Sequence, residues 1–149
     1  MNVTTVNQKY WKLFKNVNVP TSYLSIYLAS CVDVNNCVSI NSDEIAEALK
    51  ISRLELQAAV ASLMRLSVIY PEGHNQSVVN PYYIWSGQIS SPEHVDKCKY
   101  WDELIQKNPQ NVEFCKKSPK SISPNNFVVV SEILEILASS ILTNSSVEG

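Results

Sequence analysis

The stretch from Asn41 to Leu66, NSDEIAEALKISRLELQAAVASLMRL, decides the fold of this chain. Ser42 can cap a helix, and the acidic residues that follow it favour the positive end of the helix dipole. Ser52, with Glu55 three residues later, has the pattern of a capping box at the start of a second helix. The stretch therefore predicts two consecutive helices with a three-residue turn between them, over about Ser42 to Leu49 and about Arg53 to Leu66.

Short helical and β-favouring segments flank this pair of helices. A mostly buried helix is expected over Ser22–Cys31, and a short strand over Cys37–Ile40. On the other side, the β-favouring runs Val68–Tyr70 and Val78–Ile84 enclose the polar loop Pro71–Ser77. These two runs predict a β-hairpin with an extended tip.

The expected order is helix, strand, helix, turn, helix, strand, loop and strand, which is the order of a winged helix-turn-helix. The sequence therefore predicts an α+β fold, mainly α, in which the second helix of the pair enters a DNA major groove and the loop between Tyr70 and Val78 forms the wing. Arginine can bond guanine, and glutamine can bond adenine, through paired hydrogen bonds. In this interpretation the recognition helix contributes Ser52, Arg53, Glu55, Gln57, Ala58 and Ser62, contacts to the DNA backbone come from Ser42, Lys50 and Arg65, and the wing contributes His74, Asn75 and Gln76.

The same residues resemble known DNA-binding proteins. The run from Asn41 to Arg53 looks like the helix-turn-helix segment of many bacterial winged-helix regulators. Its flanks, Lys12–Phe14 near the start and Val79–Gly87 after the expected wing, are similar to the firmicute plasmid replication proteins called RepL and their mobile-element relatives. The resemblance covers about Lys9 to Gly87. It implies sequence-specific binding of double-stranded DNA in replication initiation or in its transcriptional control.

The segment after Gly87 predicts a helical extension. A helix is compatible with Pro92–Lys107, and Ser123 with Pro124 combines a cap and a first-turn proline at the start of another helix. Apolar residues then follow at alternating steps of three and four, so this last helix needs an apolar surface to cover it, in its own chain or in a second copy. We expect residues 1–87 to form the winged domain and residues 88–149 to form a C-terminal helical extension. Because winged helices of this type read paired half-sites, we expect this extension to mediate homodimerisation. The expected dimerisation residues are Phe127, Val130, Leu134, Leu137 and Ile141.

The charge balance means that any DNA contact must be local. Twelve basic and 14 acidic residues give a net charge of −2, and the region up to Gly87 has six of each. The exposed face of the expected recognition helix carries few cations, Arg53 among them. We therefore expect modest DNA affinity that depends on the pairing of two copies. The alternative is a winged-helix protein-protein interaction module in a replication or segregation assembly, with little DNA affinity of its own.

The residues do not indicate catalysis, a cofactor or a metal site. The sequence has no phosphate-binding glycine loop and its two histidines are isolated, so we expect neither an enzyme nor a cofactor. His94 and Cys98 lie one helical turn apart, but the cysteines lack the paired spacing of a zinc site, so no metal is expected. Without a signal-like or membrane-spanning apolar run, a cytoplasmic protein is expected. The cysteines, interpreted as thiols, are Cys31, Cys37, Cys98 and Cys115.

Overall fold

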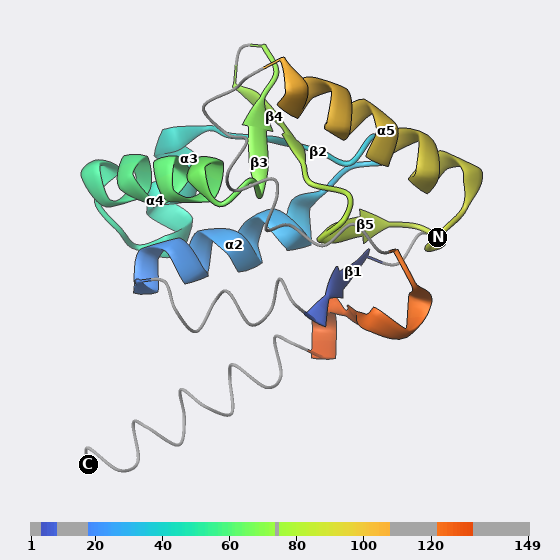
Figure 1. The fold of residues 1–149 in the computed structure, drawn as a ribbon. Coiled ribbons are helices and arrows are strands. Elements are labelled where there is room, and N and C mark those ends of the chain that lie inside the picture. The colour runs from blue at the N-terminus through green and yellow to red at the C-terminus, as the bar shows by residue number, and fades with distance from the viewer. Residues whose placement is uncertain (1–3, 9–17, 74, 108–121, 133–149) are drawn as a thin grey trace.

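The computed structural model describes residues 4–8, 18–73, 75–107 and 122–132 and shows the predicted α+β class, with two small antiparallel sheets (Figure 1). Within these residues, no helix has the length and apolar character needed to cross a membrane. The elements are β1 (Thr4–Asn7), α2 (Val19–Cys31), β2 (Cys37–Ser39), α3 (Ser42–Leu49), α4 (Arg53–Arg65), β3 (Ile69–Pro71), β4 (Gln76–Val79), β5 (Ile84–Ser86), α5 (Pro92–Gln106), a 3₁₀ turn (Pro124–Asn126) and β6 (Phe127–Val129).

The sheet β2-β4-β3 is buried on both faces. Successive side chains of a strand point to opposite faces, and here neighbouring residues enter two different cores. Val79 of β4 belongs to the main core with α2 and α4, whereas Val78 belongs to a second core with α5. In Figure 1, α5 lies on the side of this sheet opposite to α2. The expected hairpin is confirmed, with Tyr70 of β3 paired with Val78.

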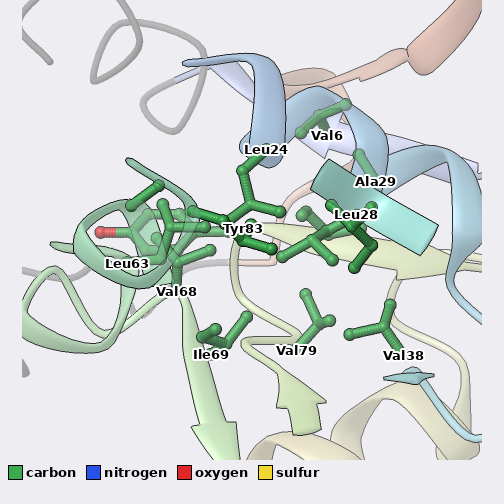
Figure 2. Close-up of a cluster of buried hydrophobic side chains, with 14 of the residues drawn as sticks. Val6, Leu24, Leu28, Ala29, Val38, Leu63, Val68, Ile69, Val79 and Tyr83 are labelled. Carbon is green, nitrogen blue, oxygen red and sulfur yellow. The ribbon is translucent and has the colours of Figure 1, made fainter. Parts of the chain in front are cut away.

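The main core joins the helices to this sheet. Leu24 and Leu28 of α2 are fully buried and pack in the same cluster as Leu63 of α4. Figure 2 shows this cluster in close-up, with side chains from α2, α4 and the sheet gathered in one region. Burial of these aliphatic side chains stabilises the packing of α4 against α2 and the sheet.

A second sheet joins distant parts of the chain. Its order is β5-β1-β6, with Thr5 opposite both Trp85 of β5 and Val129 of β6. The side chain of Asn7 is buried and donates to the Tyr82 backbone oxygen at 3.2 Å. Residues 4–7 and 127–129 therefore share one sheet, a pairing that the sequence did not predict.

The run Val78–Ile84, predicted as one strand, is divided between the two sheets. Asn80 breaks it, because its side chain donates to the Ser67 backbone oxygen at 2.8 Å and accepts from the Tyr82 backbone N–H at 2.9 Å. Pro81 follows and has no N–H to offer a neighbouring strand. The chain therefore leaves β4 at Val79 and enters the other sheet at Ile84.

The start of α2 and the cap of α3 lie earlier in the chain than predicted. Helix α2 begins at Val19, and Asn18 caps it by accepting from the Thr21 N–H at 3.0 Å. Pro20 occupies the first turn of this helix, where its missing N–H costs nothing. In α3 the cap is Asn41, and Ser42 is the first helical residue.

The last predicted helix is wrong at Phe127, which lies in strand β6 after a 3₁₀ turn. The open edge of β1 provides hydrogen-bond partners, and the β-branched residues that follow Phe127 favour an extended chain. Val130 is half-buried and packs against the main core of its own chain. The other expected dimerisation residues, Leu134, Leu137 and Ile141, lie outside the described residues.

Leu63 tests the importance of the main core for stability. Its side chain is 1% exposed, so Leu63→Ala leaves a cavity and should lower the free energy of unfolding by about 2 to 5 kcal/mol in urea titrations. Leu54 on the same helix is 78% exposed, and Leu54→Ala should change the free energy of unfolding by less than about 0.5 kcal/mol. Equal losses in the two variants would contradict the packing described for α4.

Candidate nucleic-acid interface

Helices α3 and α4 form a compact pair because the turn between them is closed by backbone and side-chain bonds. Lys50 adopts a left-handed conformation with φ 56° and ψ 48°, which ends α3. The Ile51 N–H then donates to the Ala46 oxygen at 3.1 Å. Ser52 caps α4 by accepting from the Glu55 N–H at 3.1 Å. The angle at which α4 leaves α3 is thus set within the turn itself.

Glu55 completes the predicted capping box. One of its carboxylate oxygens accepts from the Ser52 N–H at 3.0 Å. This backbone bond and the bond with the Ser52 side chain lower the pKa of Glu55 below its ordinary value of 4.5. Glu55, expected among the base-contacting residues, therefore has a capping role in the structure.

The outward face of α4 presents the other expected recognition residues. Arg53, Gln57 and Ala58 are exposed, while Ser62 one turn further on is half-buried. The opposite face is covered, with Leu56 and Leu63 inside the main core. The exposed part of α4 thus includes Arg53, Gln57 and Ala58, whereas Ser62 lies at its partly covered margin.

Leu54 also belongs to this face and is not among the residues predicted from the sequence. It is 78% exposed, more than any other large apolar residue among those described. An apolar residue in the first turn would ordinarily be assigned to the core. The signal that could have identified it is its position, because the core contacts of α4 fall at Leu56, Ala59 and Leu63, and Leu54 does not share their spacing.

Arg53 forms an ion pair with Asp43, which joins the first turns of α3 and α4. Nη2 of the guanidinium donates to Oδ1 of the carboxylate. Both side chains are largely exposed, at 67% for Arg53 and 77% for Asp43. The arginine at the start of α4 is therefore accompanied by an acid.

The residues expected to contact the DNA backbone are all exposed. Ser42 lies at the start of α3, Lys50 lies in the turn and Arg65 ends α4. Arg65 also donates to the Ser62 hydroxyl at 3.2 Å. Because they occupy the two ends of α3 and the far end of α4, these residues frame the helical pair rather than forming one cluster.

The tip of the β3–β4 hairpin, the expected wing, is tied to the start of α3. The Asn75 oxygen accepts from the Ile40 N–H at 2.7 Å, directly before the Asn41 cap. Asn75 and Gln76 are exposed, and Asn75 has a φ of 59°. His74, the third expected wing residue, lies outside the described residues. The hairpin tip is therefore positioned relative to the helical pair.

Helix α5 packs against the hairpin on the face opposite to α2. The Tyr100 hydroxyl donates to the carboxylate of Glu72 at the base of the tip, and this bond raises the pKa of Tyr100 to about 12. The Tyr82 hydroxyl donates to Asp102 at 2.7 Å, and burial together with this bond raises the pKa of Tyr82. These bonds link α5 to the residue that follows β3 and to the segment that follows β4.

His94, considered above with Cys98 for zinc, is a buried structural residue. Nε2 lies 2.7 Å from the Pro81 oxygen, and Nδ1 accepts from the Ser90 N–H at 3.0 Å. This pattern fits the neutral tautomer with its proton on Nε2. The ring also stacks on Trp85 at 4.5 Å between centroids. His94 thus fastens the segment after Asn80 to the start of α5.

The pair α3–α4 is close to electrically neutral. From Ser42 to Arg65 there are four acidic and three basic residues, a net charge of −1. Long-range attraction for a polyanion is therefore weak on this face, and any recognition of DNA must come from individual contacts.

No family model, curated protein or solved structure matches the chain.

The pH dependence of folding tests the buried state of His94. Burial lowers the pKa of His94 below 6.5, an effect that the bond to Pro81 only partly opposes. The unfolded chain therefore takes up a proton that the folded chain resists, so the free energy of unfolding should fall as the pH drops from about 6.5 towards the folded pKa.

The variant His94→Gln should flatten this part of the profile in urea titrations at closely spaced pH values. His74→Gln, which alters the other histidine of the sequence, serves as the control and should keep the wild-type slope. The same flattening in both variants would show that the slope does not come from His94.

Proposed function

We propose that this chain is a winged helix-turn-helix protein that binds double-stranded DNA in sequence-specific fashion. In this proposal α4 enters the major groove, and the β3–β4 hairpin is the wing that follows the backbone. The observation that carries the proposal is the outward face of α4, which holds Arg53, Gln57 and Ala58 on a helix fixed by two caps and by the main core.

The side chains on this face suit the edges of base pairs. The guanidinium of Arg53 can bond the two acceptors of guanine, and the amide of Gln57 can bond adenine. Leu54 and Ala58 are apolar and exposed, which suits contact with the methyl group of thymine. Backbone N–H groups at the start of α3 and α4 can bond phosphates, because a helix N-terminus carries partial positive charge.

The resemblance to RepL-like proteins supports a role in plasmid or mobile-element replication. It rests on Asn41–Arg53, which includes the turn, and on Val79–Gly87, which leaves the hairpin. Within that role the protein initiates replication or controls its transcription, and it acts in the cytoplasm. Fold and resemblance alone do not separate these two roles, so the DNA site that is bound must separate them.

Binding through two copies would compensate for the near-neutral face. Two linked half-sites raise the overall affinity without any new contact in one copy, because the second contact becomes intramolecular. We therefore propose a homodimer, held by the apolar residues Leu134, Leu137 and Ile141 of the sequence beyond the described part.

The DNA-binding prediction is tested by selection from a randomised duplex library, followed by gel shift on the enriched duplex. Wild type should enrich a defined sequence, and Arg53→Ala with Gln57→Ala should weaken binding to it by about tenfold or more, because each paired base contact contributes about 1 to 3 kcal/mol. The control is Lys99→Ala with Gln106→Ala, which likewise removes one cation and one glutamine, from exposed positions of α5. Equal binding by both double variants would rule out this placement of α4.

Light scattering tests the dimer. Wild type should have twice the mass of one chain, and Leu134→Asp with Leu137→Asp should yield monomers, because buried carboxylates without partners strongly oppose association. A monomeric wild type would end the dimer proposal.

A second candidate function is contact with another protein of a replication or segregation assembly. The observation that favours it is the exposure of Leu54 next to Ala58, together with the neutralisation of Arg53 by Asp43. In that case the protein would show no salt-sensitive retention on random duplex or on heparin at low ionic strength. A clear salt dependence of retention would favour DNA binding instead.

A further inference from the structure

We propose that Asp43 is a positioning residue that directs Arg53 towards bases and away from phosphates, and so sets the specificity of the DNA-binding face. This inference rests on the proposed DNA-binding function. It assigns a role to an acidic residue that the recognition of DNA would not otherwise require.

The geometry places Asp43 where it can orient Arg53 without burying it. Asp43 is in the first turn of α3, and Arg53 is the first residue of α4. Their ion pair uses Nη2 of the guanidinium. A guanidinium has five N–H donors in a planar fork, so enough donors remain for the two acceptors of a guanine edge. Asp43 can therefore stay bound while Arg53 reads a base.

The charge of Asp43 acts differently on bases and on phosphates. A free arginine at a helix N-terminus would attract any phosphate, whatever the sequence. With Asp43 beside it the pair has no net charge, and a phosphate that approaches Arg53 also meets the carboxylate. A guanine edge is uncharged and does not suffer this repulsion. Specificity is a difference of two affinities, so lowering phosphate binding increases it.

The fold does not depend on this ion pair. Both side chains are largely exposed, and exposed ion pairs contribute little to the free energy of folding. The hydrogen bond that caps α3 comes from Asn41, not from Asp43. Variants at Asp43 should therefore fold normally, and changes in their DNA binding can be attributed to the interface.

The experiment measures Asp43→Asn and the control Glu47→Gln on two probes, a short duplex of random sequence and the duplex enriched by selection with wild type. Glu47 is an exposed acid on the same helix, so each variant removes one negative charge from α3. Asp43→Asn should bind the random duplex about threefold to tenfold more tightly at low salt, with a salt dependence steeper by up to about one unit in log–log slope. Binding to the enriched duplex should change much less, and the preference for one base pair of the site should weaken.

Three outcomes distinguish the possibilities. If Asp43→Asn and Glu47→Gln shift binding to both probes equally, the role of Asp43 is overturned and only a general charge effect remains. In an Arg53→Ala background, Asp43→Asn should have no more effect than Glu47→Gln, and a larger effect there would also overturn it. If wild type binds neither duplex, the proposed function itself fails, and the role of Asp43 fails with it.

Discussion

Burial of the sheet β2-β4-β3 on both faces is the constraint on which the rest of the structure depends. Val78 and Val79 are adjacent and both fully buried, yet they belong to different cores. One face holds α2 and α4, which pack against each other, and the other holds α5, so the small sheet lies between α5 and these two helices. The hairpin β3–β4 is part of this sheet and cannot turn independently of the helical pair α3–α4.

Buried asparagine side chains fix the irregular chain between the two sheets. Asn36 donates to the oxygens of Val79 at 2.8 Å and Ile84 at 3.1 Å, on either side of the break in the strand. Asn80 bonds Ser67, just beyond α4. Backbone groups that leave a sheet must find other partners when they are buried, and these amides provide them. In this protein the Asn-Pro motif is therefore a structural junction, which places the hairpin relative to the end of α4.

The outward face of α4 combines a fixed geometry with weak electrostatics. Glu55 is committed to the cap of α4, and Arg53 is accompanied by Asp43, so little free positive charge remains. In the proposed DNA-binding function, such a face would discriminate through short-range contacts, because it lacks the long-range field that holds many proteins on any DNA. The same property suits the second proposed function, contact with a protein partner, in which the exposed Leu54 would be an apolar contact.

The sequence by itself determined the elements whose signals are local. Helical spacing and the capping box of Ser52 predicted α3, α4 and the turn between them, because a cap involves residues three positions apart. Local sequence signals do not predict β1 and β6, because strands this short are stabilised by pairing with distant residues. For the same reason the sequence wrongly predicts a helix at Phe127. The ion pair of Arg53 and Asp43 likewise depends on the angle between two helices. Only the tertiary structure decides such contacts, because their partners come together after the chain has packed.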